Sequence, residues 1–192
     1  MKIYIAGHRG MVGSAIWRNL EKSADYQLLG RTSKELDLKN QQDVHEFLSD
    51  EKPDVIIDAA ARVGGILANS EYPYQFLMEN MQIQNNLISS AVDLKIENFI
   101  FLGSSCIYPK MAPQPLKEEY LLTDALEPTN EWYAIAIVSG VKATEAVRNQ
   151  FGYNYVSLMP TNLYGPHDTS ASETSHVLPA MLRKFHEAKH NG

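Results

Sequence analysis

The sequence predicts an α/β fold with a doubly wound parallel sheet, and three observations indicate it. Short, continuous apolar runs alternate with longer amphipathic stretches, which is the order of repeated βαβ units. The first apolar run leads directly into a glycine-rich segment that opens a helical pattern. The length of 192 residues, with 44% hydrophobic and 21% charged residues, suits one globular domain that can bury a core.

Five apolar runs are the expected strands, and their continuous apolar character suits a parallel sheet covered on both faces. They are residues 3–6, 26–29, 55–58, 99–102 and 155–159. Amphipathic patterns predict helices at 12–21, 41–49, 73–94 and 132–150, and a last helical pattern runs over 176–190. The segment 109–130 has no clear period and is interpreted as a surface excursion over a site.

Composition narrows the possible partners. The net charge is −6 and no run of Lys or Arg occurs, so neither a nucleic-acid footprint nor a polybasic membrane patch is supported. No apolar stretch is long enough to span a bilayer, and Gly7 interrupts the first run too early for a signal peptide. The single cysteine, Cys106, excludes an intrachain disulfide and fits a reducing compartment. We therefore expect a cytoplasmic protein without nucleic-acid or membrane partners.

The spacing of Gly7, Gly10 and Gly13 predicts a dinucleotide site. The three glycines follow an expected strand and open an expected helix. Backbone amides and the positive end of the helix can then face a pyrophosphate where a Cβ would block its approach. A similar spacing without a preceding strand is more often a flexible turn, so the context makes the motif informative.

Two arginines favour NADP over NAD. The second expected strand ends near Arg31, about twenty residues after the glycine motif, where NAD sites offer a carboxylate to the ribose hydroxyls. Arg31, together with Arg9 in the glycine segment, could instead hold a 2′-phosphate through charge-assisted hydrogen bonds. The alternative is that both are ordinary solvated arginines.

Four segments resemble the GDP-L-fucose synthases, which are extended short-chain dehydrogenases/reductases. They are GHRGMVG at 7–13, GSSCIYP at 103–109, EPTNEWY at 127–133 and MPTNLYGPHD at 159–168, and the resemblance covers essentially the whole chain. It implies an NADP-binding Rossmann domain over 1–168 and the start of a substrate-binding region over 169–192. Most of the family's C-terminal substrate domain is expected to be absent.

The resemblance implies a reaction and roles for individual residues. The substrate would be GDP-4-keto-6-deoxy-D-mannose, epimerised at C3 and C5 and then reduced at C4 by NADPH to give GDP-L-fucose. Cys106 and His176 would be the acid and base of epimerisation, because a thiol and an imidazole can both titrate near neutral pH when their surroundings shift their pKa values modestly. Ser104 and Tyr133 would hydrogen-bond the C4 oxygen.

The remaining implied roles concern binding. His176 and Lys184 would contact the substrate, and family members are commonly homodimers through two long helices, for which 73–94 and 132–150 are candidates. The cofactor residues would be Gly7, Arg9, Gly10, Met11, Val12, Gly13, Arg31, Leu38, Leu102, Ser104, Ser105, Pro160, Asn162 and Leu163.

Each catalytic candidate also has a structural interpretation. Cys106 could be a buried small apolar residue, His176 could simply begin a helix, and Tyr133 could be an aromatic anchor. Their joint occurrence with the motifs favours a site. The run HEAKH at 186–190 matches a zinc motif, but it has no third ligand and the wrong fold context, so we expect no metal.

Ile137 departs from the family pattern, because the reductase sequence Tyr-x-x-x-Lys places a lysine four residues after Tyr133. That lysine would lower the phenol's pKa and bind the nicotinamide ribose, and isoleucine can do neither. Lys142 cannot replace it, since nine residues along a helix place it on the opposite face. A non-catalytic NADP-binding module and another NADP-dependent sugar-nucleotide epimerase or reductase therefore remain alternatives.

Overall fold

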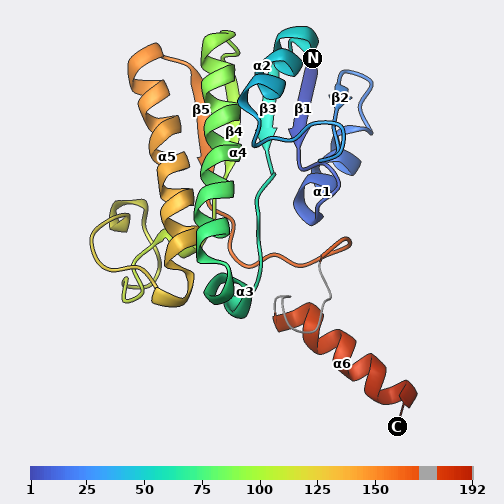
Figure 1. The fold of residues 1–192 in the computed structure, drawn as a ribbon, viewed down its shortest axis with the longest axis vertical. Helices are drawn as coiled ribbons and strands as arrows, with labels where there is room; N and C mark the ends of the chain where they lie inside the picture. Colours follow the sequence, from blue (N-terminus) through green and yellow to red (C-terminus); the bar gives the residue numbers. More distant parts are fainter. Residues whose placement is uncertain (169–176, 192) are drawn as a thin grey trace.

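A computed structural model describes residues 1–168 and 177–191. Its centre is a five-stranded sheet in the order β2-β1-β3-β4-β5, in which all neighbouring strands are parallel (Figure 1). The strands are β1 (Lys2–Ala6), β2 (Gln27–Leu29), β3 (Val55–Asp58), β4 (Asn98–Leu102) and β5 (Asn154–Leu158). The predicted doubly wound, Rossmann-like sheet is confirmed.

The helices follow the predicted order, with one addition. They are α1 (Met11–Leu20), α2 (Gln41–Glu51), α3 (Ile66–Glu71), α4 (Pro73–Asp93), α5 (Glu131–Phe151) and α6 (Val177–Asn191). The short helix α3 was not predicted, because six residues are too few to display a helical period. The predicted excursion over 109–130 contains only the short 3-10 turns Glu118–Tyr120 and Pro128–Asn130.

Two apolar layers lie on opposite faces of the sheet. The larger layer includes Tyr4, Phe99 and Tyr155 and is covered by α2, α4 and α5, with α4 and α5 packed side by side (Figure 1). The smaller layer contains Ile3, Ile5 and Ile57 with α1 against it. On this second face Val156 and Leu158 of β5 are 38% and 47% exposed, so the described elements cover it only in part.

The order of the strands places a switch point between β1 and β3. From β1 the chain moves outward to β2 and then returns to the other side of β1 as β3. Open α/β sheets bind ligands at such a point, in the crevice beyond the carboxyl ends of the strands. The segments after β1, β3 and β4 are therefore the ones that can build a site.

Candidate active site at the carboxyl edge of the sheet

The glycine segment after β1 is tightly packed against the end of β3. Gly7 has a φ of +75°, and a Cβ there would lie 2.5 Å from the Ala59 carbonyl oxygen. A Cβ on Gly13 would lie 2.2 Å from the Gly7 carbonyl oxygen, so α1 can approach β1 only with glycine at this position. Both contacts are with backbone, which cannot move aside as a flexible side chain could.

The N-terminus of α1 is open toward the same edge. Gly10 is the N-cap residue and supplies no side-chain cap, while its own N–H donates to the Gly7 carbonyl oxygen at 2.9 Å. The first amides of the helix and its positive end are thus available to a ligand. The glycine segment 7–13, called the glycine cradle below, thus places uncapped backbone amides at a helix N-terminus, and this arrangement fits the pyrophosphate of a dinucleotide.

The His8 side chain lies near the two arginines that are predicted to bind NADP. A Cβ on Gly30 would lie 2.5 Å from the His8 ring, so the ring fills the space that this glycine leaves. Burial lowers the pKa of His8, and the positive charges of Arg9 and Arg31 lower it further. Both arginines therefore act on the same side chain beside the glycine segment, and their role in holding a 2′-phosphate stays a prediction.

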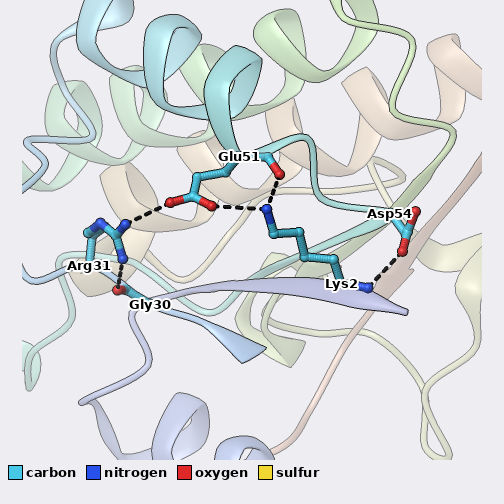
Figure 2. Close-up of polar contacts among 5 residues, drawn as sticks. All are labelled: Lys2, Gly30, Arg31, Glu51 and Asp54. Atoms are coloured by element: carbon cyan, nitrogen blue, oxygen red, sulfur yellow. Dashed lines mark hydrogen bonds and ion pairs between the residues drawn. The ribbon is translucent and has the colours of Figure 1, made fainter. Parts of the chain in front are cut away.

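Arg31 already has partners within the chain. Its guanidinium pairs with Glu51 at 2.8 Å and donates to the Gly30 carbonyl oxygen at 3.0 Å (Figure 2). It also lies over the Phe47 ring. Glu51 also pairs with Lys2, at 3.0 Å. A 2′-phosphate would thus compete with Glu51 for Arg31, a contact that sequence spacing alone could not reveal.

The second half of the site follows β4. Ser104 caps a 3-10 turn over Ser105–Ile107, and its Oγ accepts from the Cys106 N–H at 3.4 Å. Burial raises the pKa of the Cys106 thiol, although hydrogen bonds with Ser104 and Asn130 lower it in part. Cys106 is thus partly buried against the larger apolar layer, with Ser104 and Asn130 as polar neighbours.

Tyr133 stands near this turn, at the beginning of α5. Its ring packs edge-on against Phe76 at 6.4 Å between centroids. Burial raises the pKa of Tyr133 well above its usual range, and the nearby Cys106 and Asp58 raise it further. The structure therefore brings Ser104, Cys106 and Tyr133 into one cluster and holds the phenol protonated at neutral pH.

Ile137 lies one turn along α5 from Tyr133 and is part of the core. Its side chain is 2% exposed and belongs to the larger apolar layer. A Cβ on Gly103 would lie 3.4 Å from Ile137 Cγ2, so the isoleucine packs beside the turn that carries Ser104. Lys142 is exposed and pairs with Glu145 at 2.7 Å, so it does not take the missing lysine's place.

The other predicted cofactor residues occupy several segments. Ser105 and Pro160 are joined directly, because the Ser105 N–H donates to the Pro160 carbonyl oxygen at 3.1 Å. Leu38 packs against the larger core layer, and Asn162 and Leu163 are exposed in the segment after β5. Met11 and Val12 form the first turn of α1, and Leu102 ends β4.

The two predicted substrate residues are His176 and Lys184. His176 lies outside the described residues. Lys184 lies on α6, which projects away from the sheet in Figure 1. Their roles stay predictions.

Sequence reasoning missed two polar residues of the site. Asn130 hydrogen-bonds the Cys106 thiol from the turn before α5. Asp58, the last residue of β3, is 2% exposed, and its Oδ1 accepts from the Ala60 N–H at 3.1 Å. In the sequence, Asp58 is only an acidic residue at the end of an apolar run, and such a residue is equally typical of the beginning of a loop.

Two further observations concern metals and membranes. The rings of His186 and His190 lie 4.3 Å apart on α6, yet no group of three metal-ligating side chains occurs within residues 1–168 and 177–191. None of the helices described here has the length and apolar character needed to cross a bilayer.

Comparison with known proteins decides the family. The sequence profile of the NAD dependent epimerase/dehydratase family matches residues 3–191. The chain belongs to this family. It is 57% identical over 191 residues to GDP-L-fucose synthase 1 of Arabidopsis thaliana and 53% identical over 187 residues to GDP-L-fucose synthase of Escherichia coli. The resemblance predicted from the four motifs is therefore confirmed.

This epimerase/dehydratase chain spans only part of its relatives. It covers 59% of the Arabidopsis protein and 58% of the Escherichia coli protein, while all or nearly all of its own length is matched. A GDP-D-glycero-L-gluco-heptose synthase from Campylobacter jejuni, solved in the presence of NADPH, matches with a TM-score of 0.91 and 41% identity, over 98% of this chain and 55% of that one. A GDP-L-fucose synthetase from Naegleria fowleri bound to NADP matches with a TM-score of 0.86 and 28% identity, over 100% and 63%.

Proposed function

We propose that this chain is the NADPH-binding part of a GDP-L-fucose synthase. The complete reaction would epimerise GDP-4-keto-6-deoxy-D-mannose at C3 and C5 and reduce its C4 ketone. Residues 1–168 would bind the cofactor, and residues 169–192 would begin the substrate-binding region. High identity to GDP-L-fucose synthases over the whole of this chain supports the assignment.

The glycine cradle and the turn after β4 lie at the same edge of the sheet, and this arrangement is the main support for the proposal. The glycine cradle after β1 packs against the end of β3, while the turn with Ser104 and Cys106 follows β4, the next strand in the sheet. Tyr133 reaches the same turn from α5. A cofactor on the cradle and a sugar near the turn would therefore be neighbours.

The residues of the chain suit proton transfer at the sugar ring. Protons on C3 and C5 flank the C4 carbonyl and are acidified through an enolate, whose oxygen Ser104 and Tyr133 would stabilise by hydrogen bonds. The raised pKa of Tyr133 keeps its proton available for donation to that oxygen. The raised pKa of Cys106 makes the thiol better suited to donate a proton than to remove one. When bound, NADPH would supply the hydride to C4.

Ile137 limits the reductive step. No ammonium group stands one turn after Tyr133 to lower its pKa or bind the nicotinamide ribose. We expect hydride transfer to be at least about a hundredfold slower than with lysine there, as when a positioned charge is lost from a closed site. The buried apolar position also favours a second candidate function, a cofactor-binding module without reductase activity.

Titration of NADPH by fluorescence tests the proposal. We expect the chain to bind NADPH and, after addition of the GDP-keto-sugar, to oxidise it slowly if at all. Ile137→Lys should bind NADPH more tightly by returning a cation to the ribose, whereas Ile137→Met keeps the position apolar and should bind as the original chain does.

The outcomes separate the two candidates. Binding without turnover in the original chain, together with measurable NADPH oxidation by Ile137→Lys, supports an impaired synthase. Binding without turnover in both supports the binding module. Failure of the original, folded chain to bind NADPH would overturn the cofactor site for this chain, whatever the lysine variant does.

Three further expectations belong to the same proposal. The chain would form a homodimer through α4 and α5, the two long helices that pack side by side (Figure 1). A single, unbridged cysteine agrees with a cytoplasmic location. The GDP moiety would be held mainly by residues beyond the Rossmann domain, so we expect weak GDP-sugar binding by this chain.

A further inference from the structure

We propose that Asp58, acting with Ile137, makes the cofactor site prefer oxidised NADP⁺ over reduced NADPH. The inference rests on the proposed function, because it assumes that a nicotinamide ring lies near Tyr133. The ring carries a positive charge in NADP⁺ and none in NADPH. A fixed negative charge near it therefore favours the oxidised form, and a fixed positive charge favours the reduced one.

Asp58 is positioned to act on this edge of the sheet. It ends β3, where it pairs in register with Ala6 of β1 and Phe101 of β4. The chain after Ala6 is the glycine cradle, and the chain after β4 leads to the turn with Ser104. The carboxylate therefore lies between the two halves of the site and acts electrostatically on Tyr133.

The charge of Asp58 is not neutralised by the described part of the chain. Its Oδ1 accepts one backbone hydrogen bond from Ala60, and its buried Oδ2 has no hydrogen-bond partner there. None of the ion pairs found among the described residues includes it. In a buried environment such a charge is screened less than at the surface.

Ile137 supplies no positive charge to oppose the carboxylate of Asp58. In a Tyr-x-x-x-Lys site the lysine ammonium would offset a carboxylate at this edge and would disfavour a cationic nicotinamide. Here the position holds an apolar side chain that is 2% exposed. The local field around Tyr133 is therefore negative whenever Asp58 is ionised.

Asp58 should change its charge near neutral pH, whereas the tyrosines near it should not. Burial raises its pKa to about 7. Tyr4 on β1 and Tyr133 on α5 interact electrostatically with Asp58, and both are neutral near pH 7 because burial raises the pKa of each. Arg31 also acts on Tyr4, but its guanidinium is paired with Glu51 at 2.8 Å. The helices α2 and α4 add uncharged side chains to this layer, among them Val44, Gln84 and Leu87.

The preference of the site for NADP⁺ over NADPH should depend on pH. Above pH 7 the carboxylate is ionised and NADP⁺ should bind better than NADPH. As the pH falls through about 7, Asp58 gains a proton and the preference should fade. Binding of NADP⁺ stabilises the ionised carboxylate, so it should also release protons near neutral pH.

Calorimetric titration of the chain with NADP⁺ and with NADPH at pH 8 and pH 6 tests the inference. We expect Asp58→Asn to reduce the preference for NADP⁺ at pH 8 by on the order of tenfold, as for a charge interaction equivalent to about one pKa unit. Asparagine can keep the hydrogen bond to Ala60, and removing a buried charge should not impair folding. Titration in two buffers of different ionisation enthalpy then counts the protons released.

A matched control lies at the other end of the same strand. Asp54 directly precedes β3, is exposed and accepts from the Lys2 N–H at 2.6 Å (Figure 2). Asp54→Asn removes the same charge far from the cradle and should leave the preference and the proton release unchanged.

The outcomes distinguish this inference from the proposed function. An unchanged ratio of NADP⁺ to NADPH affinity in Asp58→Asn, or an equal change in Asp54→Asn, overturns the role of Asp58 while leaving the cofactor site intact. Absence of binding of both cofactor forms by the original chain overturns the cofactor site itself. A lost preference and lost proton release in Asp58→Asn alone support the inference.

Discussion

The glycine cradle and the segment around Tyr133 are built in opposite ways. In the cradle, Gly7 and Gly13 leave no room for a Cβ, and every close neighbour is backbone. In the segment around Tyr133, the position that would carry a functional cation holds Ile137, which packs in the core. The first region presents backbone groups at a helix N-terminus, whereas the second places a buried apolar side chain where the Tyr-x-x-x-Lys pattern has lysine.

Under the proposed function, cofactor binding and hydride transfer would depend on separate parts of the fold. Binding to the cradle would depend on backbone groups and on close contact between β1, β3 and α1. The reaction would depend on side chains around α5 and the turn after β4. A substitution in α5 should therefore weaken the reaction while the dinucleotide fold persists.

The largest effect is expected from Gly13→Ala in the cradle. The new Cβ would lie 2.2 Å from the Gly7 carbonyl oxygen, so α1 must move away from β1. We expect a loss of about 3 kcal/mol in the free energy of unfolding, as for overpacking against backbone, together with loss of NADPH binding. Urea denaturation and fluorescence titration measure the two effects.

Gly165→Ala is the matched control. A Cβ there would lie 3.9 Å from Met11 Cγ, which is an ordinary contact, so stability and NADPH binding should be nearly unchanged. A Gly13→Ala protein as stable as the control would show that the cradle tolerates a Cβ, and the contrast between the two regions would fail.

A smaller effect concerns the Cys106 thiol beside Tyr133. Because burial raises its pKa, we expect the folded chain to react with iodoacetamide at pH 8 roughly threefold or more slowly than the same chain unfolded in urea. Cys106 is the single cysteine, so every alkylated molecule reports on it.

The pH profile separates ionisation from access. Poor access alone would slow the reaction equally at every pH, whereas a raised pKa moves the midpoint of the profile above that of an ordinary thiol, about 8.5. A midpoint at or below that value would contradict the proposed role of Cys106 as a proton donor.

The smallest effect is expected from Glu51→Gln. The change frees Arg31 from its ion pair, so NADPH affinity should rise by about twofold, while stability should fall by less than about 1 kcal/mol. The affinity for NADH, which lacks the 2′-phosphate, should not change. Glu145→Gln, which breaks the exposed pair with Lys142, is the control, and an equal gain for NADH and NADPH would exclude Arg31 as the phosphate ligand.

The fold and the position of the glycine segment could both be predicted from the amino-acid sequence. The five strands and the long helices lie close to their predicted bounds, because apolar runs and helical periods are local features of the chain. The glycine spacing is local as well, and its requirement for a strand before it and a helix after it could be checked in the sequence. The identity of residue 137 was also plain, since a missing lysine needs no structure to be seen.

The pairing of charged side chains became visible in the folded structure only. Arg31 pairs with Glu51 across twenty residues, and Asp58 ends a buried strand with one carboxylate oxygen that no described residue satisfies. Neither fact has a local signal, because ion pairing and burial depend on elements brought together by the sheet. The pKa values of Asp58, Cys106 and Tyr133 depart from normal for the same reason: burial, the largest cause of each shift, exists only in the folded chain.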